Sequence, residues 1–593
     1  MAKSRKPRRP APPDAPGRAE LVVVAAPDAG LRARGGDLAA ARDADASAMR
    51  EALESVGAQI TPLFGPSEDR ARSGLAPDRA PDPAEDPGLF YHVEAPEDEL
   101  ASLAETLNEL DAVEAAYVKP AGELPVEVAE PPEDVADVDD IEAAPLNDMA
   151  PAPDEPPMTT ADFTGRQGYL DAAPGGIDAR FAWTQAGGRG GGVRVIDLEW
   201  GWRFNHEDLR QNQMGVLAGT NSSALRSENH GTAVIGEISG DRNRYGVVGI
   251  APDARIGAVA FSMPTARAIR TAADRLGPGD ILLLEIHRAG PRHNFQGRED
   301  QRGYVAVEWW PDDYQAIRYA VEKGIIVVEA AGNGRENLDD RIYDRNPASP
   351  NGPFPRWWSN PFRRRGLDSG AVVVGAGAPP PGTHGRTHGP DRSRLDFSNY
   401  GALVDAQGWG REVTTTGYGD LQGGADRDLW YTDRFSGTSS ASPIVVGALT
   451  CVQGVLRSRG RALLDPARAR ELLRATGSPQ QDAPGRPRTQ RIGNRPDLRQ
   501  LIPRALRSAA RTGVQGRGTI PARSSRRWFT HSWPAHWHVL WTVMSNTPRP
   551  GGPQLRLRVR TERSSDRHVT YWLTITNLTD RPVEAEARFA VLS

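Results

Sequence analysis

Residues 436–451 read Ser436-Gly437-Thr438-Ser439-Ser440-Ala441-Ser442-Pro443, followed at once by the apolar run Ile444 to Cys451. This pattern predicts a buried helix that begins at a serine with small neighbours. The start of a helix offers free backbone N–H groups and the positive end of its dipole, which stabilise developing negative charge. Ser439 is therefore well placed to act as a nucleophile. Taken alone, however, Gly-Thr-Ser is also typical of an ordinary loop that meets a helix.

Three segments upstream of Ser439 each place a side chain that could assist a nucleophilic serine at the end of a strand or the start of a helix. The strand predicted from Val193 ends at the carboxylate of Asp197, and reactive groups gather at the carboxyl ends of strands in open α/β sheets. His230 precedes a helix rich in small residues, and the apolar run from Gly324 delivers Asn333 into a glycine-flanked turn.

The ordered set of Asp, His, Asn and Ser resembles the subtilisin-like serine peptidases (family S8). Residues 247–255 and the turn Phe397-Ser398-Asn399-Tyr400-Gly401 look like two further segments of that family, and the resemblance covers about Ala161 to Leu501. It implies an α/β fold with a subtilisin-like, mostly parallel sheet and helices on both faces. The alternative is an unrelated α/β protein in which all of these motifs occur by chance.

The resemblance also implies a chemistry for each matching residue. Ser439 attacks a peptide carbonyl, His230 accepts its proton, and Asp197 orients the imidazole and stabilises its charged form. The Asn333 amide and the Ser439 backbone N–H form the oxyanion hole. Taken singly, each residue is more simply explained as a helix cap, a core histidine or a turn asparagine.

The sequence departs from the family pattern beside the acid. After Asp197 the family usually continues with Thr or Ser and then Gly, whereas this chain continues with Leu198-Glu199-Trp200-Gly201-Trp202. We therefore expect a remodelled loop there. His206 is a second candidate for the base, but it lacks the Gly-Thr helix that follows His230.

The strand that pairs with substrate in the family corresponds here to Leu284-Glu285-Ile286-His287. Glu285, Ile286 and His287 are therefore the candidate substrate-binding residues. An acid and an imidazole at that edge read polar or basic substrate side chains, or they serve as structural hydrogen-bonding groups; the sequence does not separate these readings.

Two long loops, Arg288 to Asp313 and Arg335 to Asp368, border the expected cleft. Long loops in a compact domain are often functional, so we expect restricted specificity or gated access. The acids of the second loop favour basic substrate residues or are simply surface charge. No metal or cofactor is required for the chemistry. Structural calcium, which the family often binds, stays open and unassigned, with oxygen donors such as Asp241 and Asn243 in loops.

Composition limits the class of partner and the cellular location. The net charge of −5 and the isoelectric point near 6.2 give no reason to expect a nucleic-acid partner, and no segment reads as a membrane span. The basic N-terminus is not followed by a convincing signal peptide, so we expect a cytoplasmic protein, with secretion by a non-standard route left open. The expected partner is a protein or peptide substrate. The single cysteine, Cys451, is expected in the core.

An N-terminal domain with βαββαβ order is expected before the peptidase-like region, because leucines recur on one face of the helix between Pro96 and Leu110. That order predicts a ferredoxin-like fold similar to the inhibitory propeptide of the family. An unrelated small α/β domain is the alternative. An acidic, proline-rich linker follows, and self-cleavage is expected between Val118 and Glu133 if this domain is a propeptide.

Alternating strands and five tryptophans near the C-terminus predict a small β-sandwich. The indoles are more typical of a core than of a ligand platform, and the spacing of His531, His536 and His538 is only a weak metal signal. This domain is the expected site for a partner protein. We divide the chain as follows: 1–17 disordered, 18–120 ferredoxin-like domain, 121–160 linker, 161–502 subtilisin-like domain, 503–527 linker, 528–593 β-sandwich.

Two functions follow from these observations. The first is a serine endopeptidase made as a zymogen and controlled by its N-terminal domain. The second is a catalytically silent binding or scaffold protein that retains the fold.

Overall fold

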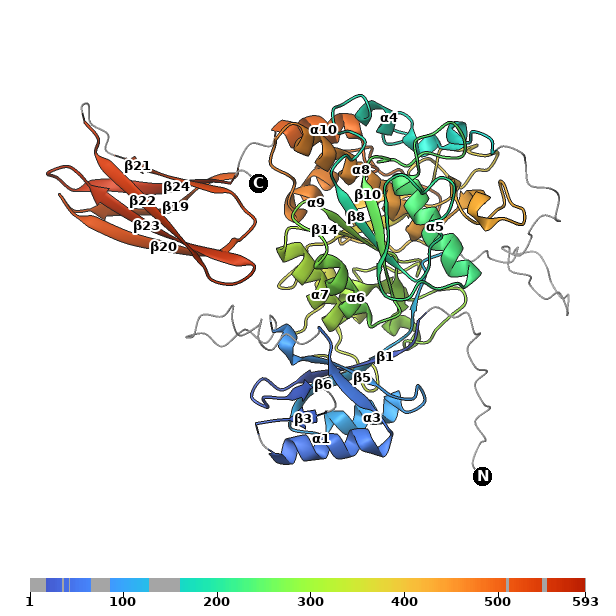
Figure 1. Cartoon of the computed structure of the whole chain (residues 1–593), viewed down its shortest axis with the longest axis horizontal. Helices are drawn as coiled ribbons and strands as arrows, with labels where there is room; N and C mark the ends of the chain where they lie inside the picture. The colour runs from blue at the N-terminus through green and yellow to red at the C-terminus, as the bar shows by residue number, and fades with distance from the viewer. Residues whose placement is uncertain are drawn as a thin grey trace.

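The chain folds into three parts that follow one another along the sequence. The computed structural model describes residues 17–34, 37–41, 43–64, 86–126, 160–507, 511–546 and 552–591. Figure 1 shows the N-terminal part in blue beneath the central part, and the C-terminal part in red beside it. The expected disordered N-terminus and most of the acidic linker lie outside the described residues.

The central part is built on a seven-stranded sheet in which every pairing is parallel. Its strands read as short apolar runs, as expected when both faces of a sheet are covered. The prediction of an α/β fold with a parallel sheet is confirmed. The order across the sheet is β16 (Ala406–Trp409), β15 (Val372–Gly377), β14 (Ile326–Ala330), β11 (Ile281–Leu284), β8 (Arg194–Glu199), β10 (Arg255–Ala260) and β9 (Gln213–Ala218).

Helices cover both faces of this sheet (Figure 1). One face packs on α5 (Leu225–Ser239) and α8 (Thr438–Ser458), together with α4 (Ala179–Ala182), α9 (Pro466–Ala475) and α10 (Leu498–Arg507). The other face packs on α6 (Thr265–Ala273) and α7 (Pro311–Glu322). Of the described helices, only α8 is long and apolar enough to cross a membrane, and its apolar stretch is buried in this core.

The N-terminal part is a four-stranded antiparallel sheet covered by two helices. Its six main elements follow the expected βαββαβ order along the chain. A short hairpin of β2 (Arg32–Arg34) and β3 (Asp37–Ala39) was not expected. The sheet order is β4 (Gln59–Pro62), β5 (Phe90–Glu94), β1 (Glu20–Ala25) and β6 (Val113–Lys119), with helices α1 (Asp43–Ser55) and α3 (Leu100–Asn108).

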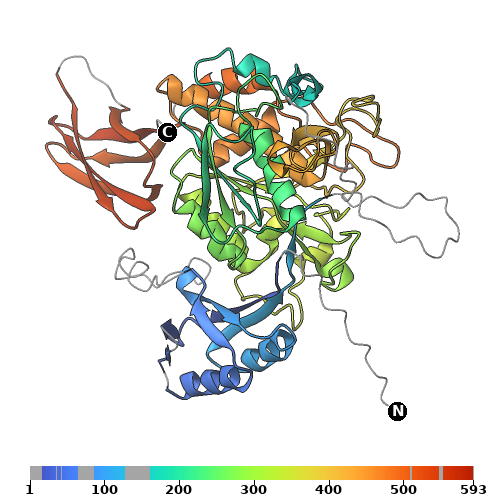
Figure 2. The same ribbon diagram turned by 45° about the vertical axis from the view of Figure 1, so that its right-hand side comes forward.

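The alternation of β1 explains how this sheet serves two cores. Side chains of successive strand residues point to opposite faces. Leu21 and Val23 pack with α1 and α3, whereas Val22 and Val24 join the core that contains α6 and α7. The sheet therefore lies between its own helices and the central part, as both views show (Figure 2).

The C-terminal part consists of two three-stranded antiparallel sheets. Trp533 and neighbouring aromatic rings form its core, and Trp533 lies 4.9 Å from Phe589 between ring centroids. Arg567 connects this part to α7 through an ion pair with Glu322 at 2.5 Å. The sheets are β19 (Arg511–Ile520), β24 (Val583–Val591), β21 (Val539–Ser545) and β20 (Ser525–Pro534), β23 (His568–Asn577), β22 (Leu555–Arg563).

The expected linker at 503–527 is corrected by this arrangement. Helix α10 continues to Arg507, β19 occupies residues 511–520, and β20 begins at Ser525. Glycine at position 513 of β19 leaves room for the neighbouring strand, because a Cβ there would lie 2.7 Å from the Phe589 ring.

Candidate active site

The nucleophile candidate lies where the sequence predicts it. Ser439 is the second residue of α8, which follows Gly437 with φ of 104°. A Cβ at residue 437 would lie 2.1 Å from the carbonyl oxygen of Pro125, so only glycine lets another backbone approach the serine this closely. The Ser439 hydroxyl donates to that carbonyl at 2.9 Å. A peptide carbonyl from the N-terminal part of the chain therefore already occupies the position in front of the serine.

The base candidate, His230, lies on α5 and is completely buried. Its Nδ1 is 2.7 Å from Oε2 of Glu199, and its ring packs edge-on against Phe435 at 5.4 Å. Its Nε2 has no hydrogen-bond partner among the described residues. The nitrogen that must accept a proton is thus unoccupied, while the serine hydroxyl is engaged with Pro125.

The acid in contact with the imidazole is Glu199, which corrects the expectation for Asp197. Because side chains alternate along a strand, both carboxylates of β8 lie on one face, and the strand simply continues two residues further. Asp197 instead accepts a hydrogen bond from Trp202 Nε1 at 2.7 Å. The sequence carried a signal for this change, since Glu199 and Trp202 are the residues that depart from the family pattern.

Burial dominates the electrostatics of this group. It raises the pKa of the Glu199 carboxyl well above its usual range, and burial with the neighbouring Glu199 does the same for the pKa of Asp197. Burial, with a smaller contribution from Arg226, lowers the pKa of His230 to about 3. All three shifts favour uncharged groups, so with the cleft filled the imidazole is neutral and able to accept a proton.

The other histidine candidate, His206, plays no part in this cluster. Its Nε2 lies 2.8 Å from the backbone oxygen of Trp430, and its ring packs against Tyr431. Burial lowers the pKa of His206 to about 4. This residue holds the loop after β8 in place.

The oxyanion candidate, Asn333, lies beside the start of α8. Its Oδ1 accepts from the backbone N–H of Thr438 at 3.0 Å and from the Thr438 hydroxyl at 2.9 Å. The Asn333 amide N–H₂ points the other way and donates to Gln301 Oε1 at 3.3 Å. Gln301 in turn donates to the Leu124 carbonyl at 2.9 Å. Gln301 belongs to the long loop 288–313, and no sequence motif identified it.

The three residues expected to bind substrate divide into two groups. Ile286 and His287 lie against the segment in the cleft: a Cβ at Gly122 would meet Ile286 at 2.5 Å, and His287 pairs with Glu123 across a β ladder. Glu285 is wrong as a substrate-binding residue, because its buried carboxylate accepts from Ser442 Oγ at 2.5 Å, behind the nucleophile.

The segment in the cleft runs from Pro120 to Val126. Its strand β7 (Gly122–Glu123) is antiparallel to β12 (His287–Ala289), which also pairs with β13 (Tyr304–Ala306). Leu124 and Pro125 are buried. The segment therefore lies in the cleft as an added strand, which is how extended peptides are commonly recognised.

A buried ionic cluster connects the N-terminal part to the helices of the central part. Lys119 is fully buried, and its ammonium lies 2.5 Å from Asp312, 2.9 Å from Asp313 and 3.1 Å from Glu20. Arg288 reaches Glu20 at 2.5 Å. The Glu20 carboxylate also accepts from the Thr265 hydroxyl at 2.8 Å, at the start of α6, where the helix dipole favours negative charge.

The long loop 335–368 also contacts the N-terminal part. It meets the edge strand β6, where the Val118 N–H donates to the Pro350 carbonyl at 2.7 Å, and Asn351 Nδ2 donates to the Val118 carbonyl at 2.7 Å. The Arg356 N–H donates to Glu114 at 2.9 Å. The loop thus covers an edge strand that is otherwise open to pairing.

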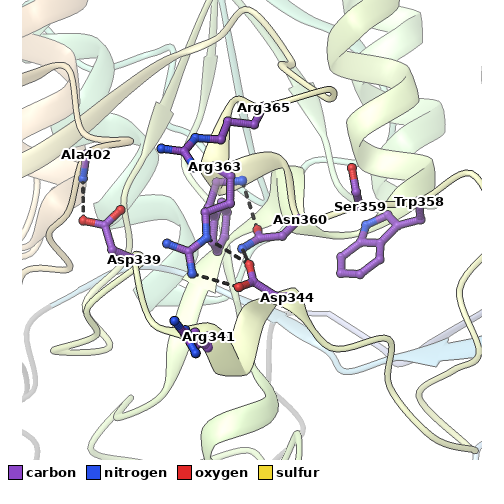
Figure 3. Close-up of a pocket in the computed structure, with 10 residues that line it drawn as sticks. Asp339, Arg341, Asp344, Trp358, Ser359, Asn360, Arg363, Arg365 and Ala402 are labelled. Atoms are coloured by element: carbon purple, nitrogen blue, oxygen red, sulfur yellow. Dashed lines mark hydrogen bonds and ion pairs between the residues drawn. The ribbon is translucent and has the colours of Figure 1, made fainter.

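A pocket lies against that loop, lined mostly by its residues and away from Ser439. It has a volume of about 620 Å³, and Figure 3 shows the Asp344 and Arg363 side chains paired at its wall, 2.9 Å apart. Other acids of the loop are paired as well, for example Glu336 with Arg292 at 3.0 Å. These acids are therefore engaged in structural pairs, and neither Ser439 nor His230 lines the pocket.

Metal ligation finds no support in the described part of the chain. No group of three or more His, Cys, Asp or Glu side chains there is arranged to hold an ion. Asp241 accepts backbone N–H groups from Arg210 at 2.8 Å and Gln211 at 3.0 Å, and Asn243 donates to Asp208. The oxygen donors considered for calcium are thus used in holding loops.

Several known proteins are similar to this chain. Residues 201–493 match the profile of the subtilase family, Peptidase_S8. The chain is 28% identical over 315 residues to an intracellular serine protease of Paenibacillus polymyxa, covering 51% of this chain and 78% of the relative. It is 26% identical to thermitase of Thermoactinomyces vulgaris, covering 51% and 85%. Among solved structures, fervidolysin from Fervidobacterium pennivorans aligns with 95% of this chain and 68% of its own, at 15% identity and a TM-score of 0.46.

Proposed function

We propose that Ser439, His230 and Glu199 carry the reaction of this subtilisin-like serine endopeptidase, whose residues 201–493 match the subtilase family. We further propose that its N-terminal domain holds the enzyme inactive until that domain is displaced. The observation that carries both proposals is the hydrogen bond from the Ser439 hydroxyl to the Pro125 carbonyl. It presents a peptide group of the chain itself to the nucleophile.

The catalytic steps follow from the side chains around this contact. Ser439 Oγ attacks the carbonyl carbon, and His230 Nε2 takes the hydroxyl proton and later delivers it to the leaving amine. Glu199 holds the Nδ1–H and stabilises the imidazolium that forms. The Asn333 amide donates to the oxyanion once Gln301 no longer accepts from it. Water then hydrolyses the acyl-enzyme in the same way.

A ferredoxin-like assignment for the N-terminal domain is supported by its sheet order β4-β5-β1-β6 and its two helices on one face. A β-sandwich assignment for the C-terminal domain is supported by its two three-stranded sheets around one aromatic core. The comparisons favour a peptidase over the silent scaffold. A cytoplasmic location stays a prediction.

The C-terminal domain is proposed as the docking site for a partner protein. Residues 511–593 contain 13 arginines, no lysine and five acids, whereas the whole chain is net negative. In the described part of the chain, the exposed large hydrophobic residues all lie in this domain: Val514, Phe529, Leu540, Met544 and Val559. Exposed apolar side chains among arginines are typical of interaction surfaces.

Labelling with a fluorophosphonate probe tests the proposal directly. We expect slow covalent labelling of the wild-type chain and none of Ser439→Ala, because only the activated hydroxyl reacts. Intact mass of the incubated wild type should reveal self-cleavage after Pro125, since that bond has an ordinary amine as its leaving group. Absence of labelling under conditions that displace the N-terminal domain contradicts the proposal, and equal masses for wild type and Ser439→Ala count against self-processing.

The ionic cluster predicts how the enzyme can be released. In Lys119→Met the carboxylates of Asp312 and Asp313 remain buried without their cation, which should weaken docking of the N-terminal domain by about 3–5 kcal/mol. The rate of fluorophosphonate labelling should therefore rise strongly. Lys323→Met is the matched control, because Lys323 lies on the far end of α7 and contacts Asp274. An unchanged rate for Lys119→Met would exclude this cluster as the restraint.

A further inference from the structure

The side chain of Glu123 lies in a site made for a carboxylate. The Tyr304 hydroxyl donates to Glu123 Oε1 at 2.5 Å. That hydroxyl also accepts the backbone N–H of Arg298 at 3.1 Å, so its single proton is directed at the carboxylate. Tyr304 itself is fully buried, and its ring packs on His287 at 4.6 Å. The donor is therefore held in place before any peptide binds.

Burial raises the pKa of Glu123 above its usual range, and the Tyr304 hydrogen bond, Arg226 and Gln301 each act against that rise. Gln301 is 98% buried and also donates to the next carbonyl of the segment, that of Leu124. Arg226 is exposed at the start of α5 and carries the positive charge. We name Tyr304 and Gln301, whose hydrogen bonds reach the segment in the cleft, the acid subsite.

The acid subsite belongs to the enzyme and not to the N-terminal domain. Tyr304 is on β13, whose partner β12 pairs with the segment in the cleft, with His287 opposite Glu123. Any peptide that replaces the segment on β12 must place a side chain at the same point of the ladder. Of the alternatives that the sequence leaves open for this edge, recognition of basic side chains is disfavoured, because the group that reaches Glu123 is a hydroxyl donor.

We infer that the acid subsite selects substrates with a glutamate two residues before the residue whose carbonyl faces Ser439, within sequences like Glu-Leu-Pro. The inference rests on the proposed function and names its substrate class. A lysine at that point meets a Tyr304 hydroxyl that is committed as a donor. A substrate with glutamine in place of this glutamate has nearly the same side-chain shape but no charge. Comparing the two therefore separates recognition of the charge from recognition of the shape.

The test compares two quenched fluorescent peptides, Gly-Glu-Leu-Pro-Val and Gly-Gln-Leu-Pro-Val, with the full chain. The ratio of their kcat/KM values within one sample is independent of how many molecules are open. We expect the glutamate peptide to be preferred about tenfold or more, as is typical for a hydrogen bond to a charged group. Tyr304→Phe keeps the ring contact with His287 and should bring the ratio close to one. A ratio near one in the wild type, or an undiminished ratio in Tyr304→Phe, overturns the inference.

A second measurement does not depend on catalysis. In the full chain carrying Ser439→Ala, adding Glu123→Gln should increase hydrogen exchange of the Glu123-position and Leu124 amides at least severalfold. Glu114→Gln, at the contact with Arg356 outside the cleft, is the control and should leave these amides unchanged. Unchanged exchange in the Glu123→Gln chain overturns the acid subsite. Faster exchange together with no fluorophosphonate labelling of the wild type would retain the subsite and reject the proposed function.

Discussion

Ser439→Ala should lower kcat by about 10⁶-fold, and His230→Ala should lower it by a similar factor, because the hydroxyl and the imidazole act as one unit. Without Nε2 the hydroxyl has no acceptor for its proton, and without the hydroxyl the imidazole has nothing to activate. The double variant should therefore be scarcely slower than either single variant. Turnover of a quenched peptide by the full chain, after displacement of the N-terminal domain, measures all three.

The control for this experiment is Ser442→Ala, one turn along α8. Ser442 donates to the buried Glu285 and to the Thr438 carbonyl, and it lies behind the nucleophile. Its loss should change stability more than turnover. Losses that add in the Ser439/His230 double variant would mean that the two groups do not act together, and the assignment would fail.

The sequence predicts most of the N-terminal and central parts because their patterns are local. Alternation in residues 20–25 and the leucine spacing of α3 depend only on which face of an element is buried. Ser439 and Asn333 stand where short motifs specify a helix start or a turn, which are features that neighbouring residues determine. His230 was expected before a helix and is instead the sixth residue of α5, because that helix begins earlier, at Leu225.

The features that the sequence did not predict depend on contacts between distant segments. Which carboxylate contacts His230 depends on how far β8 continues. The sequence does not distinguish Asp197 from Glu199, because side chains two residues apart on a strand point to the same face. Gln301 and Tyr304 acquire their roles only when residues 120–126 enter the cleft. Strand β19 lies in the region expected to be a linker, and its glycines pack against aromatic rings from β24 and β20 that are remote in sequence.

Glu199→Gln should reduce kcat by about 10⁴-fold, the loss expected when the group that orients a catalytic histidine can no longer stabilise its charged form. Glutamine is nearly isosteric and can still accept the Nδ1–H, so the fold and the ring position are retained. What is lost is the carboxylate 2.7 Å from Nδ1. Once the N-terminal domain is displaced and water reaches the cleft, the burial that favours its uncharged form is reduced, and its negative charge balances the imidazolium in the transition state.

Asp197→Asn is the matched comparison, because Asp197 lies on the same strand face and is equally buried. Asparagine keeps an oxygen for Trp202 Nε1, and the charge removed does not touch the imidazole, so kcat should fall by less than about tenfold. Turnover and fluorophosphonate labelling of both variants separate the two acids. If Asp197→Asn lost most of its activity and Glu199→Gln kept it, the catalytic carboxylate would be that of Asp197, as the family pattern implies. The longer strand would then only bring Glu199 into a structural contact with the ring.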